Sequence, residues 1–207
     1  MRLSSSIEPS PQKKLGHFFL RFVMLALVLG FVLNRTQDTW APALLPALQT
    51  ELEWLDDTYK IQNLSLDREG ADRVVRVVVS QARFIVLGDV AYRPHPLGRA
   101  NASTLLGNVM LPAVLLTAMV LAWPIGVPSR TGRIKVALRR AAMLPLALTM
   151  LWSLDVPFVL WAAIWSLHVD AFAPGMFSPL LVWSQFLQGG GRDMLAIGLA
   201  VAVCSFA

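Results

Sequence analysis

Four long apolar runs, separated by polar segments, dominate the pattern of this sequence. They cover residues 15–33, 104–125, 141–167 and 194–207. A helix of about 20 apolar residues crosses the hydrocarbon core of a bilayer. We therefore predict a mainly α-helical membrane protein with about four transmembrane helices.

Two of these runs differ from the ideal length. Residues 141–167 would form a helix of about 40 Å, so tilt, a kink at Pro157 or protrusion from the bilayer is expected. Residues 194–207 reach only about 21 Å. Either this helix begins in the preceding glycines, or the bilayer thins around it, or the sequence ends early.

The polar segment 34–103 has periodicities of its own. Leucines spaced by three and four residues predict a helix over 42–55. Strand-like runs at 59–66, 73–80 and 84–92 predict a three-strand meander. We expect a small α+β module with a weak core, which leans on its own spans, on a second copy or on another protein. The Val-rich edge of the meander is a candidate for strand addition by a partner.

The remaining segments are connections. Residues 1–14 are predicted to be a polar tail and 126–140 a basic loop, while 168–193 is predicted to lie along the outer interface. Within that last segment, the apolar stretch in 172–188 is too short to span, which favours an interfacial or re-entrant helix. If it does span, the C-terminus moves to the other side of the membrane.

Charge gives the orientation. The tail carries three basic residues and one acid, and the loop 126–140 carries five basic residues and no acid. The segment 34–103 has eight basic and nine acidic residues. Short loops rich in Lys and Arg stay in the cytoplasm. The prediction is a multi-pass protein of the bacterial inner membrane, with a cytoplasmic N-terminus and residues 34–103 extracytoplasmic.

The composition agrees with a membrane protein and argues against a nucleic-acid-binding protein. The chain is 56% hydrophobic and 15% charged, whereas soluble domains carry about a quarter charged residues. The net charge is +5. The basic residues lie beside apolar runs and form no basic face with interleaved aromatics, so nucleic acid is not an expected partner. Membrane lipids and other membrane or periplasmic subunits are.

Two polar side chains interrupt the apolar runs. Asp155 lies near the centre of 141–167, and Asn108 lies in 104–125. A carboxylate at mid-bilayer costs on the order of 3 kcal/mol on insertion scales, so Asp155 should have a partner or a task. No Lys or Arg is expected at its depth, which points to Asn and Thr side chains or to another subunit. A proton-relay or transport role is the functional alternative.

A second polar group is expected on the outer side. His95, Arg99 and Asn101 precede the second run, and His168 follows the third. They are candidates for binding lipid headgroups, a peptide or a lipid-linked substrate. No metal-ligand spacing, nucleophile motif or phosphate-binding glycine loop occurs, so no catalytic residue, metal or cofactor is assigned.

The layout resembles that of small bacterial inner-membrane proteins that accompany exosortase systems. The features that carry the resemblance are an N-terminal anchor, a short β-rich outer segment and His95-Pro96-Leu97 leading into the apolar run at 101–124. The resemblance implies an accessory role in sorting or exporting envelope material, not protease chemistry. The leading expectation is a non-enzymatic accessory subunit of an envelope export, sorting or assembly complex. The alternatives are a relay subunit using Asp155 and a membrane enzyme acting on lipid-linked substrate at the outer interface.

Overall fold

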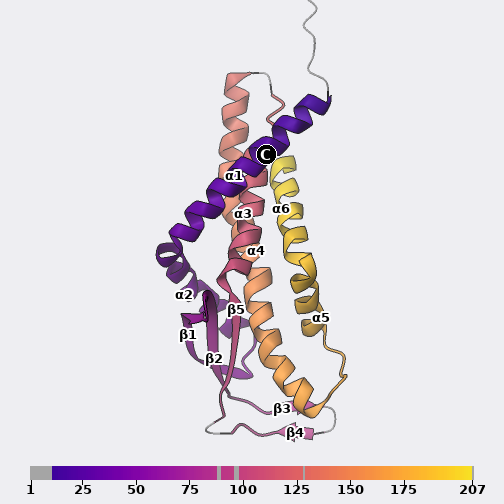
Figure 1. The fold of residues 1–207 in the computed structure, drawn as a ribbon. Coiled ribbons are helices and arrows are strands. Elements are labelled where there is room, and N and C mark those ends of the chain that lie inside the picture. Colours follow the sequence, from indigo (N-terminus) through magenta and orange to yellow (C-terminus); the bar gives the residue numbers. More distant parts are fainter. Residues whose placement is uncertain (1–10, 88–89, 96–97, 128, 207) are drawn as a thin grey trace, which may run out of the picture.

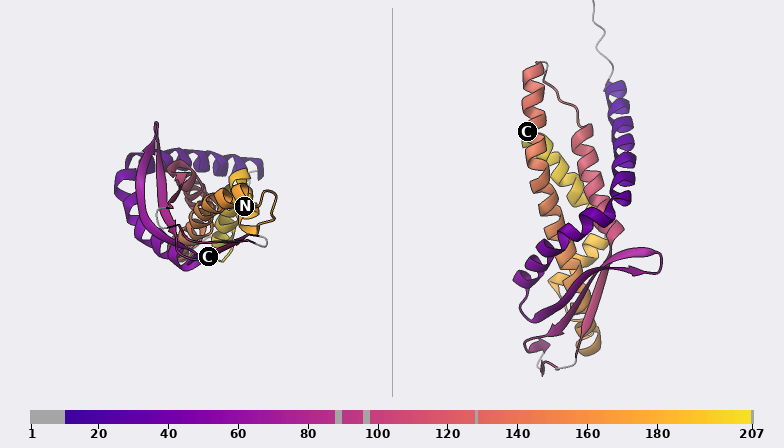
Figure 2. Two further views of the ribbon diagram at one scale, coloured as in Figure 1. Left: turned by 90° about the horizontal axis from the view of Figure 1, so that it is seen from below. Right: turned by 90° about the vertical axis from the view of Figure 1, so that its left-hand side faces the viewer.

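The computed structural model describes residues 11–87, 90–95, 98–127 and 129–206. A helical bundle occupies one end of the elongated molecule, and a small sheet lies against the other half of its longest helix (Figures 1 and 2). In chain order the elements are α1 (Pro11–Arg35), α2 (Gln37–Leu55), β1 (Tyr59–Glu69), β2 (Asp72–Gln81), β3 (Ile85–Leu87), β4 (Val90–Tyr92), β5 (Ala100–Leu105), α3 (Leu106–Ala122), α4 (Arg130–Phe172), α5 (Pro179–Phe186), a π-helical turn (Leu187–Gly191) and α6 (Arg192–Phe206).

Within the described residues, three helices are long and apolar enough to cross a membrane. They are Leu15–Arg35, Arg130–Phe172 and the continuous helix Pro179–Phe206. The remaining predicted span, 104–125, corresponds to α3, which is apolar but has 17 residues. It begins at Leu106 because the first two residues of the predicted run 104–125 belong to β5. These helices indicate association with a membrane.

The helix α4 is longer than predicted at both ends. Its 43 residues extend about 65 Å and contain Pro145 and Pro157 without ending. The prediction of a loop over 126–140 is wrong for residues 130–140, which form the first three turns. Ser129 caps this start, since its side chain accepts a hydrogen bond from the Gly132 amide at 3.1 Å.

The last helix also begins earlier than predicted. The segment 168–193 is not a separate element: its first residues belong to α4, and α5 continues through the π-helical turn into α6. Its location at the outer interface stays a prediction. The helix bends at the three consecutive glycines, residues 189–191, and does not end there. Gly190 has φ +106°, a conformation that a residue with a Cβ rarely adopts.

The predicted outer module, a name kept here for α2 with β1 to β5, contains the predicted helix and a rearranged sheet. β1 and β2 confirm the first two predicted strands, and they pair antiparallel. The third prediction is wrong: the run 84–92 forms a separate hairpin of β3 and β4, and β5 supplies the third strand of the sheet, in the order β1-β2-β5. The reason is the stiff Arg93–Pro94 segment after β4, where proline limits strand pairing. The Val-rich β2 is therefore the central strand, not an exposed edge.

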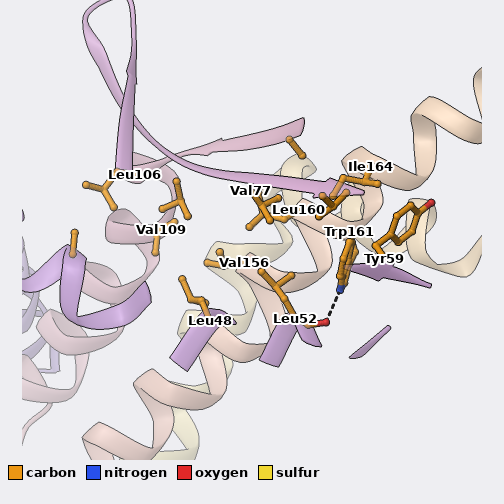
Figure 3. Packing of buried hydrophobic residues seen from close by; sticks show 14 of the residues in the cluster. Leu48, Leu52, Tyr59, Val77, Leu106, Val109, Val156, Leu160, Trp161 and Ile164 are labelled. Atoms are coloured by element: carbon orange, nitrogen blue, oxygen red, sulfur yellow. Dashed lines mark hydrogen bonds between the residues drawn. The ribbon is translucent and has the colours of Figure 1, made fainter. Parts of the chain in front are cut away.

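Two hydrophobic cores divide the molecule. The outer core lies between α2, the sheet and the second half of α4, and includes Leu52, Val77, Leu160, Trp161 and Ile164 (Figure 3). The inner core joins α3, the first half of α4 and α6, where Ala196 and Ala200 allow close helix contact. The module thus packs on its own long helix, one of the supports expected from its small size.

The first helix has a different environment. It lies along α3, with Phe18 in edge contact with Trp123 at 5.8 Å between ring centroids. Its apolar side chains are exposed on the remaining sides, as at Phe19, Leu27 and Phe31. The predicted tail 1–14 lies outside the described residues up to position 10, and residues 11–14 belong to α1.

Candidate functional site

Asp155 forms a buried ion pair with Arg192. The Nε of Arg192 donates to Oδ1 of Asp155 at 2.6 Å, and the two side chains are 9% and 2% exposed, respectively. The expectation that this aspartate lacks a basic partner in its own chain is therefore wrong. Arg192 escaped the sequence analysis because the predicted last span began after it.

The glycine turn explains how Arg192 reaches Asp155. A Cβ on Gly191 would lie 2.5 Å from the ring of Phe186 and 2.6 Å from its carbonyl oxygen, so the chain turns closely here. Just before the turn, Trp183 donates from Nε1 to the Leu154 carbonyl at 3.1 Å. α5 is thus fixed on α4 one residue from Asp155, and the turn directs Arg192 to the same helix.

Asp155 lies where the bundle meets the outer module. Two residues earlier, Ser153 donates to a carboxylate oxygen of Glu51 in α2. Trp152 donates from Nε1 to the Val109 carbonyl in the first turn of α3, at 3.2 Å. About two and a half turns after Trp152, Trp161 donates to the Leu52 carbonyl at 3.2 Å. The ion pair therefore sits beside the outer end of α3 and not midway along it.

Asn108 lies near the ion pair, because it borders the same cavity as Arg192. A cavity of about 250 Å³ is bordered by Asn108 and Arg192, together with Gln188 and Asp193. Asn108 itself is exposed. The two polar residues predicted within apolar runs are thus connected by an arginine that belonged to neither prediction.

The outer candidates converge on a second, smaller cavity. His95, Arg99 and His168 line a space of about 130 Å³, together with Tyr59 and Gln81. Asn101 is not among its lining residues; it is exposed on β5, opposite Val78 in the sheet register. His168 comes from the end of α4 and Tyr59 from the start of β1, so the cavity depends on the contact between module and helix.

The contact between Tyr59 and His168 is the best-defined part of this cavity. The Tyr59 hydroxyl lies 3.2 Å from Nδ1 of His168, and the same nitrogen lies 3.2 Å from the Ile164 carbonyl. Burial, with a smaller effect of the Asp56 charge, raises the pKa of Tyr59 above its ordinary value. The hydroxyl therefore keeps its proton and donates to Nδ1 when the imidazole carries its hydrogen on Nε2. The other tautomer donates from Nδ1 to the carbonyl.

The chemistry of this cavity suits binding more than metal chemistry. A guanidinium, two imidazoles, a phenol and an amide supply hydrogen-bond donors for an oxygen-rich or anionic group. Among the described residues, no group of three or more His, Cys, Asp or Glu side chains is arranged to hold a metal ion. Three of the lining residues were predicted from the sequence, but Tyr59 was not, since a single tyrosine at a strand start has no distinguishing pattern.

Comparison with known proteins adds no assignment. No protein-family model, curated protein sequence or solved structure matches the chain. The resemblance to proteins that accompany exosortase systems therefore stays a prediction.

Proposed function

We propose that this chain is a non-enzymatic, integral inner-membrane accessory subunit of an envelope export, sorting or assembly complex. In this proposal α1, α3, the first half of α4 and α6 all cross the membrane. The outer module is extracytoplasmic and presents a binding surface for another protein.

The inner boundary of the proposed spanning bundle is marked by contacts among its helices. Arg140 in α4 donates to the carbonyl of Trp123, just after α3, at 2.8 Å. Trp123 also contacts Phe18 of α1. The first turns of α4, before Arg140, contain Arg130, Arg133 and Lys135, whose positive charge favours the cytoplasmic side of the membrane.

The outer boundary is marked by Trp152, Val109 and the ion pair. Arg140 and Asp155 are fifteen residues apart in α4, or about 22 Å along the axis. This is less than a hydrocarbon core of about 30 Å. With Arg140 at the inner edge, Asp155 and Arg192 would lie about 8 Å inside the outer edge of the hydrocarbon core. They are then nearer to the outer headgroups than to mid-bilayer, which lowers the cost of charge.

The main support for an accessory-subunit role is a group of exposed apolar side chains far from this bundle. Phe172 ends α4, about 25 Å beyond Asp155 along the helix. Around this end, Phe84, Val86, Val90 and Phe177 are 59%, 65%, 52% and 77% exposed. The hairpin β3–β4 lies at this end of the molecule (Figure 1), where Tyr92 contacts Phe172 at 4.2 Å between ring centroids.

Such a surface is too far from the bundle to be covered by lipid. Contiguous patches of exposed apolar side chains mark protein interaction sites. We call Phe84, Val86, Val90, Phe172 and Phe177 the outer-tip surface. A membrane-anchored chain that presents apolar groups at its outermost end fits a subunit that docks a periplasmic or membrane partner.

The test is site-specific photocross-linking in intact cells. A photoreactive amino acid at Val86 or Phe177 should yield a discrete cross-linked protein, because these side chains would face the partner. The matched control places the same amino acid at Asn63 or Arg68, exposed positions on β1 farther from the tip. Equal or absent cross-linking at all four positions would contradict the proposal.

The relay alternative has less support. A relay carboxylate must gain and lose protons, whereas Asp155 is held by a guanidinium that stays charged. The pair is better suited to fixing α6 against α4 at the base of the module.

A second candidate function is ligand binding or catalysis at the outer cavity. The observation that favours it is the convergence of His95, Arg99 and His168 with Tyr59 around one space. His168 lies thirteen residues beyond Asp155, or about 20 Å along α4. A substrate there would need to extend well beyond the headgroups. Alanine at His168 should abolish such an activity while leaving expression unchanged.

A further inference from the structure

A cavity between the helices of the bundle has an almost entirely apolar lining. It encloses about 420 Å³ between α1, α2, α3 and α4. This volume lies in the ordinary range of ligand pockets, about 300–1,000 Å³. Eleven side chains line it, all apolar except Thr117: Leu29, Val32, Leu33, Trp40, Ala43, Leu44, Met110, Ala113, Thr117, Leu148 and Trp152.

The two tryptophans present only ring surface to this cavity. Trp40 donates its indole hydrogen to the Leu33 carbonyl at 2.9 Å. Trp152 donates its own to the Val109 carbonyl at 3.2 Å. With both N–H groups satisfied by backbone, the outer end of the cavity offers no indole donor to a polar ligand. The lining therefore selects a hydrocarbon occupant.

The cavity is continuous with the surface that α1 exposes. Val32 lines the cavity and is itself 47% exposed, and Val28, one turn earlier, is 54% exposed. If α1 and α4 cross the membrane, as proposed above, lipid chains surround this surface.

A cation lies at the headgroup end of the same helix. Arg35 ends α1, two residues after Leu33, and its guanidinium lies over the Phe31 ring at 5.4 Å. Basic residues at this depth attract lipid phosphate. A chain inserted beside Leu33 would leave its headgroup near Arg35.

We propose that this cavity holds one acyl chain of a membrane phospholipid of the outer leaflet. The inference rests on the proposed membrane location of the bundle. The bound chain fills the space between α1 and the rest of the bundle and so fastens the first helix, which contributes few buried side chains, to α3 and α4.

The experiment uses the full-length protein reconstituted with a phospholipid that carries a photoreactive group on its acyl chain. Mass spectrometry then maps the labelled residues. Labelling is expected at Met110, Ala113 or Thr117 inside the cavity, and it should persist when unlabelled lipid is added in excess before illumination. Labelling at Phe19 and Leu27, on the exposed side of α1, should instead decrease in proportion to the amount of unlabelled lipid added.

A cavity-filling variant gives the matched control. Ala113→Phe should remove the dilution-resistant labelling while leaving the dilutable labelling of Leu27 unchanged. Leu111→Phe, at a 61% exposed position of the same helix, should change neither. The inference would be overturned if, in the unaltered protein, excess unlabelled lipid reduced the labelling of Met110 and Thr117 as much as that of Leu27. This result would count even if Ala113→Phe fails to fold.

Failure of the proposed function can be recognised separately. If carbonate extraction releases the protein from membranes, the membrane location itself is wrong. If the protein stays in membranes and the outer-tip surface yields no cross-linked partner, the acyl-chain site is still tested by the dilution result alone.

Discussion

Arg192 and Asp155 form a buried pair in which Nε donates to Oδ1 at 2.6 Å, and this contact fixes α6 to α4 beside the outer module. Removing one member of a buried pair leaves an uncompensated charge, which costs about 3–5 kcal/mol. Arg192→Met should therefore destabilise the protein by that order, as measured by thermal unfolding in detergent. Asp155→Leu combined with Arg192→Met should recover most of the loss. A single variant as stable as the parent would contradict this account of the pair.

The glycine turn should be sensitive at one position and tolerant at another. Gly191→Ala places a Cβ against the Phe186 ring and carbonyl, so a loss of about 1–3 kcal/mol is expected from overpacking. Gly198→Ala, later in the same helix, meets nothing within 4 Å, and should be neutral or stabilising by up to about 1 kcal/mol. The same unfolding measurement compares them. Equal effects would mean that the turn is not closely packed.

Docking of the module on α4 should depend on Trp161. This side chain is 4% exposed, stacks on Tyr59 at 5.3 Å and donates to the Leu52 carbonyl. Trp161→Phe should cost roughly the hydrogen bond, about 0.5–1.5 kcal/mol, whereas Trp161→Ala should cost about 3–5 kcal/mol. Limited proteolysis would report the loss, with faster cleavage between α2 and β1 in the alanine variant. Unchanged cleavage would show that the module is held by other contacts.

The environment of Tyr59 predicts a dependence of stability on alkaline pH. Because burial raises its pKa in the folded state, the folded protein binds more protons than the unfolded chain above pH of about 10. The free energy of unfolding should therefore fall as pH rises through that range. Tyr59→Phe should remove this contribution and also the late part of the tyrosinate absorbance change. Identical titrations of parent and variant would contradict the burial argument.

Sequence patterns were informative where one periodicity decides the structure. The apolar run at 15–33 and the leucine spacing in 42–55 predicted helices that the structure contains as α1 and α2. The helix α4 extends beyond its predicted run because the polar residues before that run, such as Arg133 and Arg139, are good helix formers that carry no apolar signal.

Patterns failed where tertiary contacts decide. β5 consists of small and polar residues, and becomes a strand because Ala102 and Thr104 are buried against neighbours from distant segments. Arg192 follows three glycines, which read as a break, yet their close turn directs it to Asp155. The cavity around His95, Arg99 and His168 was predicted only as a group of residues on one side, since their meeting depends on how β1 packs on α4.

The central claim is that this membrane chain works as a subunit of a complex. Affinity purification of the full chain from native membranes in mild detergent tests it most directly. We expect at least one partner in fixed stoichiometry, lost in a Val86→Glu, Phe177→Glu variant and retained in Arg68→Glu, at the opposite end of β1. A parent protein that elutes as a clean monomer, with no stoichiometric partner, would contradict the claim.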